Sequence, residues 1–142
     1  MAGLNKERKI ETIKKRKKTN YGISAREKSM KEIKAFIKPH MLSNVVMELS
    51  KYEGLSGLSV TKVQGFGRSR AKGARHRIVE DLIDYVPYVK LEIVCRDSFV
   101  DEIVAIIEKT ARTGLTGDGK IFVSAIETAV RISTGDRDEA AV

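Results

Sequence analysis

The sequence of 142 residues contains no tryptophan, one cysteine, two prolines and two histidines. A single thiol, Cys95, cannot form an intrachain disulfide and offers no second sulfur ligand for a structural zinc site, which is typical of a reducing compartment. No apolar run approaches the roughly 20 residues of a membrane-spanning helix, and the N-terminus lacks the apolar stretch of a secretory signal. These absences predict a soluble, cytoplasmic protein with one core and no metal or disulfide staple.

The positive charge is concentrated at the N-terminus. The formal net charge is +8, and residues 1–29 hold 10 basic and 3 acidic side chains, whereas the remainder holds 17 and 16. We therefore expect a disordered basic extension over residues 1–29 and a nearly neutral domain over residues 30–142. The extension could bind an anionic surface or could be a solvated tail without a partner, and composition alone favours the second reading.

From Met30 onward the hydrophobic pattern switches between strand and helix periods. Strands are predicted at 30–37, 58–63, 89–95 and 120–124, with a further short one at 130–132. One helix is predicted to start at an N-cap Ser43 and stop at Gly54, and a second to start at an N-cap Ser98 and stop near Gly114. The order βαββαβ predicts an α+β, ferredoxin-like sandwich with both helices on one face of an antiparallel sheet. The other face needs cover, which predicts a homo-oligomer.

Two glycine-rich turns lie beside strands, one at 65–68 and the other at 113–120. Glycine has no Cβ, so consecutive backbone N–H groups can turn inward and form an anion nest. Arg68 or Lys120 could neutralise a phosphate held there, and Arg131 follows the second turn closely enough to join it. The pattern is neither a Walker sequence nor a dinucleotide fingerprint, because Lys120 leads into a strand. Taken singly, such a turn is most often an ordinary hairpin.

Five segments together resemble the PII signal-transduction family, the nitrogen regulatory proteins, over residues 30–142. They are 30–39, 60–68, 89–94, 111–123 and 130–136. The resemblance implies a ferredoxin-like protomer in a compact homotrimer, with ATP or ADP bound in clefts between subunits; Mg²⁺ could accompany ATP. It also implies a non-enzymatic regulator whose T-loop, residues 69–84, docks on a target such as a transporter, a metabolic enzyme or a transcriptional regulator.

By position, the resemblance assigns particular residues to these roles. The nucleotide-binding set is Ser59, Gly65, Phe66, Gly67, Arg68, Val94, Gly117, Asp118, Gly119, Lys120 and Arg131. The partner-docking set in the T-loop is Arg70, Lys72, Arg75, His76 and Arg77.

Several positions depart from the family pattern. Ser69 replaces the glutamine that helps to hold magnesium and 2-oxoglutarate, and Tyr88 replaces the lysine that pairs with the distal carboxylate of that ligand. Losing a charge-assisted hydrogen bond removes about 1.5–3 kcal/mol, so 2-oxoglutarate sensing is in question. Ser133 stands where an arginine usually supports the phosphates, which could narrow the preference for ATP over ADP. Asp81 and Val79 replace the tyrosine and serine that are modified in other members, which excludes both modifications.

Other function classes stay open beside an adenine-nucleotide sensor. The chain could sense a different small anion or nucleotide state without a 2-oxoglutarate response. A nucleic-acid-binding module using the basic extension ranks lower, because the strand cores offer only Phe36 and Phe122 as stacking aromatics. An enzyme also ranks low, since His40 and His76 have no nucleophile placed beside them by the sequence.

Overall fold

The computed structural model describes residues 29–66 and 85–142. The expected T-loop and, apart from Ser29, the expected N-terminal extension lie outside the described residues. Within the two described ranges, no helix combines the length and apolar character that crossing a membrane requires. The elements are β1 (Met30–Ile37), η1 (Pro39–Met41), α2 (Leu42–Leu49), β2 (Ser59–Gly65), β3 (Val86–Arg96), η3 (Asp97–Phe99), α3 (Val100–Ala111), β4 (Lys120–Ile126) and η4 (Asp138–Ala140).

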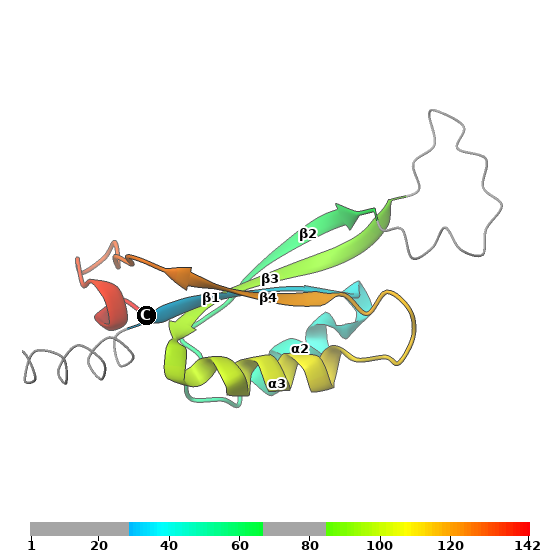
Figure 1. The fold of residues 1–142 in the computed structure, drawn as a ribbon, viewed down its shortest axis with the longest axis horizontal. Helices are drawn as coiled ribbons and strands as arrows, with labels where there is room; N and C mark the ends of the chain where they lie inside the picture. Colours follow the sequence, from blue (N-terminus) through cyan, green and yellow to red (C-terminus); the bar gives the residue numbers. More distant parts are fainter. Residues whose placement is uncertain (1–28, 67–84) are drawn as a thin grey trace, which may run out of the picture.

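The four strands form one antiparallel sheet in the order β2-β3-β1-β4. Both α-helices lie along the same face of this sheet, as Figure 1 shows. This arrangement confirms the predicted ferredoxin-like α+β fold. β1 is a central strand, and near its C-terminal end Phe36 lies opposite Lys90 on β3 and opposite Lys120 on β4. The register therefore places the start of β4 beside the end of β1.

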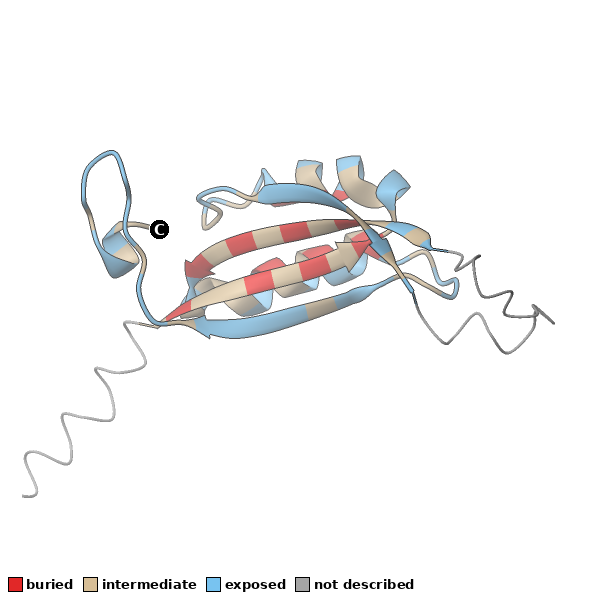
Figure 2. Cartoon of the chain, turned by 90° about the horizontal axis from the view of Figure 1, so that it is seen from above, coloured by how far each residue is buried: buried red, intermediate tan, exposed pale blue. Residues whose placement is uncertain are grey.

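The core lies between the sheet and the two helices. From Ile33 to Ile37 in β1 and from Val89 to Cys95 in β3, every second residue is buried there, which is the period-two pattern that the sequence predicts (Figure 2). The two helices leave none of these strand residues exposed, and the alternate residues on the other face, such as Phe36 and Val94, are half-buried. The buried cluster comprises Ile33, Ala35, Ile37, Val45, Leu49, Val89, Leu91, Ile93, Cys95, Ile103, Ile107 and Ala111.

The face of the sheet away from the helices is mixed in character. A row of charges crosses it, in which Lys90 lies 3.1 Å from Glu92, and Lys34 lies 3.9 Å from Glu92 and 3.7 Å from Glu32. Apolar rings stand beside this row, including Phe122. This face is therefore not uniformly apolar, and the homotrimer stays a prediction.

Both helices begin with a 3₁₀ turn, and this overturns the two predicted serine caps. The residue preceding α2 is Met41 and the one preceding α3 is Phe99, and neither helix has a side-chain cap. Because the chain is already helical over η1 and η3, Ser43 and Ser98 lie inside helical turns and their hydroxyls are not at the N-cap position. Helix α2 ends at Leu49, earlier than predicted. The short strand predicted at 130–132 is reduced to an isolated bridge between Val130 and Arg137.

Candidate functional site

A groove of about 950 Å³ lies at the end of the sheet where β2 finishes and β4 starts. It is bordered by the described part of the first glycine turn, Gly65 and Phe66, and by the second turn over residues 116–120. Two segments separated by some fifty residues of sequence therefore face one ligand-sized space. The lining residues are Phe36, Lys38, Pro39, His40, Gly65, Phe66, Val86, Pro87, Tyr88, Thr116, Gly117, Asp118, Gly119, Lys120 and Phe122.

The second turn passes very close to the backbone of β1. Gly117 and Gly119 have φ angles of +88° and +103°, a range that L side chains rarely adopt. A Cβ at Gly119 would lie 1.7 Å from the carbonyl oxygen of Phe36, so only glycine fits there. The close approach to β1 places Gly117–Lys120 along the wall of the groove.

Asp118 holds this turn together from the inside. Its carboxylate accepts hydrogen bonds from the backbone N–H groups of Thr113 (2.9 Å) and Gly114 (3.0 Å), and from the Thr113 hydroxyl. The ammonium group of Lys38 lies 3.0 Å away and also donates to the Thr113 hydroxyl at 2.9 Å. The Thr113 hydroxyl and the Lys38 ammonium hold the pKa of Asp118 well below its usual range. The Asp118 side chain thus organises the turn.

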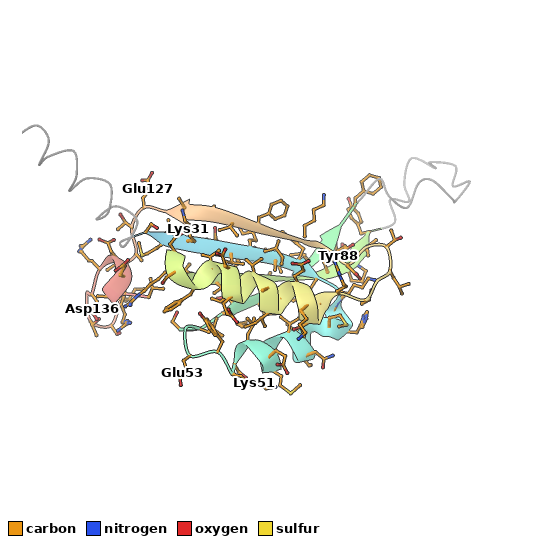
Figure 3. All side chains as sticks on the ribbon, turned by 60° about the horizontal axis from the view of Figure 1, so that its bottom comes forward. Lys31, Lys51, Glu53, Tyr88, Glu127 and Asp136 are labelled. Carbon is orange, nitrogen blue, oxygen red and sulfur yellow. The ribbon has the colours of Figure 1, made fainter. Side chains whose placement is uncertain are left out.

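Tyr88 on β3 connects the two glycine segments. Its hydroxyl donates a hydrogen bond of 3.1 Å to the carbonyl oxygen of Gly117. Its ring lies against Gly65, where an added Cβ would be 3.2 Å from a ring carbon. Figure 3 shows Tyr88 at the end of the sheet that carries the turn following α3. From the sequence, Tyr88 was interpreted as the replacement of a lysine and as a packing residue at the entry of the strand. Its position between the two glycine segments was missed, because the residue type gives no signal for it.

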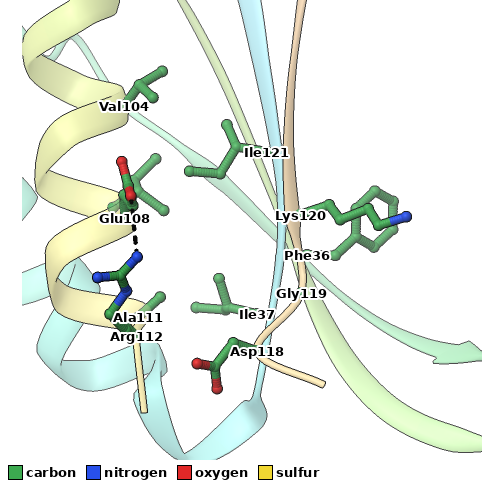
Figure 4. Close-up of a pocket in the computed structure, with 11 residues that line it drawn as sticks. Phe36, Ile37, Val104, Glu108, Ala111, Arg112, Asp118, Gly119, Lys120 and Ile121 are labelled. Atoms are coloured by element: carbon green, nitrogen blue, oxygen red, sulfur yellow. Dashed lines mark ion pairs between the residues drawn. The ribbon is translucent and has the colours of Figure 1, made fainter. Parts of the chain in front are cut away.

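Lys120 and Phe36 stand next to each other on adjacent strands. Figure 4 shows both side chains on the side of the sheet away from α3, whereas Ile37 and Ile121 point toward α3. Among the residues that the structure describes, Lys120 forms no ion pair. By contrast, Lys38 is neutralised by Asp118. Of the two lysines that line the described part of the groove, Lys120 is therefore the one available to an anionic ligand.

A smaller hollow of about 450 Å³ lies on the helix side of the same turn (Figure 4). Its walls are mostly apolar side chains of α3 and the sheet, such as Ile107 and Ile121. The Glu108 carboxylate lies 3.6 Å from the Arg112 guanidinium there, so this cation already has a partner. The hollow therefore suits a phosphate less well than the larger groove does.

Three residues of the predicted nucleotide-binding set do not line the groove. Ser59 begins β2, six residues or about 20 Å from Gly65 at the other end of that strand. Val94 is near the far end of β3. Arg131 follows the C-terminal end of β4 at Ile126, whereas the turn precedes the other end of this strand at Lys120; the Arg131 guanidinium is 3.4 Å from the Asp136 carboxylate.

The expectation that Arg131 joins the second turn is therefore wrong for a single chain. The whole length of β4 intervenes between them, about 20 Å of extended strand. Gly67, Arg68 and the five docking residues between positions 70 and 77 lie outside the described residues.

Comparison with known proteins gives consistent matches. The family model described as nitrogen regulatory protein P-II matches residues 30–136. The nitrogen regulatory protein P-II of Haemophilus influenzae is 46% identical over 113 residues, which are 80% of this chain and all of that protein. Nitrogen regulatory protein P-II 1 of Escherichia coli K12 is 45% identical over the same coverage. The crystal structure of Arabidopsis thaliana PII bound to citrate matches with a TM-score of 0.66 and 34% identity, covering 80% of this chain and 92% of that one.

Proposed function

The chain belongs to the nitrogen regulatory protein P-II family, and from this premise we propose that it is a cytoplasmic, non-enzymatic sensor of ATP and ADP that regulates nitrogen and carbon metabolism. In this proposal the bound nucleotide sets the conformation in which the T-loop, residues 69–84, docks on a target protein. The target is a transporter, a metabolic enzyme or a transcriptional regulator.

The observation that carries the proposal is that Gly65 and Phe66, the described residues of the first glycine segment, face the second glycine turn across one groove. Gly65 and Phe66 line one side and Gly117–Lys120 the other, around a space of about 950 Å³. Backbone N–H groups of glycine turns bind phosphate oxygens without any side-chain charge. Lys120 adds the permanent positive charge that a polyphosphate needs. This combination suits a nucleoside di- or triphosphate better than it suits a neutral ligand.

The fixed turn limits the energy that binding must supply. Asp118 holds Thr113 and Gly114 by backbone hydrogen bonds, and Tyr88 holds the carbonyl of Gly117. Because these groups are ordered before the ligand arrives, little conformational entropy is lost on binding. ATP and ADP then differ only in the phosphate that reaches toward the end of β2. Since the T-loop begins just after this strand end, the nucleotide can bias the T-loop by its differential contacts.

A second copy of the chain supplies the rest of the proposed site. Ser59, Val94 and Arg131 belong to the predicted nucleotide-binding set but do not line the groove of their own chain. In a homotrimer with clefts between subunits, these residues of one protomer would face the groove of its neighbour. Arg131 would then add a second cation to the polyphosphate after leaving Asp136. The separation of the predicted site residues between the two ends of the sheet supports an oligomer more strongly than the mixed charged and apolar face of the sheet does.

Mg²⁺ and 2-oxoglutarate need separate treatment. No group of three or more His, Cys, Asp or Glu side chains in residues 29–66 and 85–142 could hold a metal. Mg²⁺ would therefore be bound mainly through the phosphates of ATP and water. Tyr88 places a phenol against Gly65 and Gly117, and a phenol cannot neutralise the second carboxylate of 2-oxoglutarate. We therefore propose a sensor without a 2-oxoglutarate response.

Isothermal titration calorimetry of the full-length protein with ATP, ADP and AMP, with and without Mg²⁺ and 2-oxoglutarate, tests this function. We expect Lys120→Met to raise the Kd for ATP about 10- to 150-fold, because a charge-assisted hydrogen bond is worth about 1.5–3 kcal/mol. Lys51→Met is the matched control, since Lys51 is an exposed lysine at the end of α2 that pairs with Glu48. Equal affinity in wild type and Lys120→Met would refute the site, and synergy between ATP and 2-oxoglutarate would refute the reading of Tyr88.

A further inference from the structure

We propose that His40 acts as a pH-dependent cation of the groove, so that polyphosphates bind more tightly as the pH falls. The proposal rests on the nucleotide function argued above and concerns how the groove responds to acid. His40 lines the groove together with Lys120, and it is the only histidine among the residues that the structure describes. Histidine is the side chain whose ordinary change of charge falls between pH 5 and 8.

The backbone after β1 holds His40 in place beside this groove. His40 lies in the 3₁₀ turn η1, where Pro39 fixes the first backbone angle. The N–H group of Met41 donates to the carbonyl oxygen of Lys38 at 3.0 Å and closes the turn. The Cα atoms of Lys38 and His40 are therefore at most about 7 Å apart. Since the Lys38 ammonium lies 3.0 Å from Asp118, His40 belongs to the segment that touches the second glycine turn.

The described part of the groove carries little positive charge while the imidazole is neutral. The other charged or titratable side chains that line it are Lys38, Asp118, Tyr88 and Lys120. Lys38 and Asp118 neutralise each other, and a tyrosine phenol is uncharged near neutral pH. Lys120 is then the net positive charge of these residues. Protonation of His40 doubles that charge, which raises the attraction for a ligand with several negative charges.

The side chain of His40 is available for this role. His40 is exposed, and within residues 29–66 and 85–142 it forms no ion pair. No residue of η1 is buried, so the ring does not belong to the core. A neutral imidazole has one hydrogen-bond donor and one acceptor, whereas the imidazolium has two donors. Protonation therefore adds a charge and also replaces an acceptor by a donor that suits a phosphate oxygen.

The direction of the effect follows from the linkage between proton binding and ligand binding. An anion in the groove favours the imidazolium over the neutral ring, so ligand binding takes up protons and the affinity rises as the pH falls. The terminal phosphate of ATP also gains a proton near pH 6, which lowers the charge of the ligand and acts in the opposite direction. Because this second effect belongs to the ligand, it cancels when protein variants are compared at the same pH.

The experiment is a calorimetric titration of the full-length chain with ATP at pH 6 and pH 8. The proteins are wild type, His40→Gln, which cannot be protonated, and His40→Lys, which is charged at both pH values. We expect His40→Gln to raise the Kd about three- to fivefold at pH 6, the upper part of the range for an exposed ion pair, and to leave it unchanged at pH 8. His40→Lys should lower the Kd by about the same factor at pH 8.

Two further measurements separate this role from a general effect of charge or structure. Ser56→Lys adds a positive charge at an exposed position outside the groove, and it should leave the Kd at pH 8 unchanged. Titration between pH 6 and 7 in two buffers of different ionisation enthalpy gives the number of protons taken up. Wild type should take up roughly 0.3 proton more per bound ATP than His40→Gln does.

The contrary results are equally defined. A ratio of the His40→Gln and wild-type constants that is the same at pH 6 and pH 8, or equal proton uptake by the two proteins, would overturn the proposal. A His40→Lys variant without tighter binding at pH 8, or with no more gain than Ser56→Lys, would show that position 40 does not face the phosphates. In these cases wild type still binds ATP and the nucleotide function stands. Wild type that binds no ATP at either pH would refute the nucleotide function, and this proposal with it.

Discussion

Gly119→Ala tests the close approach between the second glycine turn and β1. Gly119 has a φ of +103°, and a Cβ there would lie 1.7 Å from the carbonyl oxygen and 2.8 Å from the carbonyl carbon of Phe36. The obstacle is backbone, so no side-chain rotation can relieve the overlap. The turn or the end of β1 must move away, and the adjacent pairing of Phe36 with Lys120 begins the β1–β4 ladder. We therefore expect a large loss of stability.

The size of this loss can be worked from its parts. A side chain at positive φ costs about 1–2 kcal/mol. We expect about two or three ladder hydrogen bonds to be lost as the strands separate, each adding about 1 kcal/mol. A total of about 3–5 kcal/mol is at the upper end for single substitutions. Since about 1 kcal/mol corresponds to roughly 4 °C for a domain of about 100 residues, Gly119→Ala should lower the Tm by about 12–20 °C.

Gly114→Ala is the matched control. Gly114 lies in the same turn with a φ of +77°, but an added Cβ meets nothing within 4 Å. Its cost is the backbone term alone, about 1–2 kcal/mol, so on the same scale the Tm should fall by only about 4–8 °C. Thermal unfolding followed by circular dichroism at one fixed protein concentration measures both variants. A Tm of Gly119→Ala within a few degrees of Gly114→Ala would refute the reasoning.

Two further predictions concern the groups that hold this turn. Tyr88→Phe removes the hydrogen bond to the carbonyl of Gly117 while keeping the ring against Gly65, so calorimetry should show a Kd for ATP raised about 2- to 10-fold, and an unchanged Kd would contradict the bridging role. Asp118→Asn removes a carboxylate whose pKa is lowered by the Thr113 hydroxyl and the Lys38 ammonium. A lowered folded-state pKa gives stability that is fully present above the ordinary value of 3.8 and is lost progressively as the pH falls below it. The difference in unfolding free energy between wild type and Asp118→Asn should therefore be constant from pH 7 to 5 and shrink between pH 4 and 3. A difference that stays constant down to pH 3 would show that the Asp118 pKa is not lowered by folding.

The fold was largely predictable because its signals are local. The alternation of apolar residues in β1 and β3 and the helical spacing in α3 depend on neighbours within a few positions, and the structure reproduces them. The helix starts were not predictable in the same way. A serine before an apolar run predicts an N-cap. Here a 3₁₀ turn, Pro39–Met41 or Asp97–Phe99, precedes each helix, so the helical backbone already begins before the predicted cap or includes it. Ser43 and Ser98 gave no sign of these turns.

The candidate site was predictable only in part. The glycines beside Lys120 indicated the second turn, because Gly117 and Gly119 have positive φ angles that favour glycine. Gly67 and Arg68 of the first segment lie outside the described residues. The hydrogen-bond and ion-pair partners of the individual side chains could not be predicted from the sequence pattern. Asp118 was assigned to the ligand, yet its carboxylate is used by Thr113, Gly114 and Lys38. Such long-range pairings depend on the register between β1 and β4, which sequence periodicity does not specify.

The distance of Arg131 from the second turn of its own chain bears on the oligomeric state. A strand of seven residues separates the two, so a single chain cannot bring them to one phosphate. When residues of one family pattern lie at both ends of a rigid sheet, a shared ligand requires a second copy whose far end meets the first copy's groove. Such a contact is heterologous and closes into a ring when its rotation allows. Nucleotide binding and assembly would then be linked equilibria. ATP should therefore stabilise the oligomer against dissociation on dilution, by an amount set by the ratio of its affinities for the assembled and the separate chains.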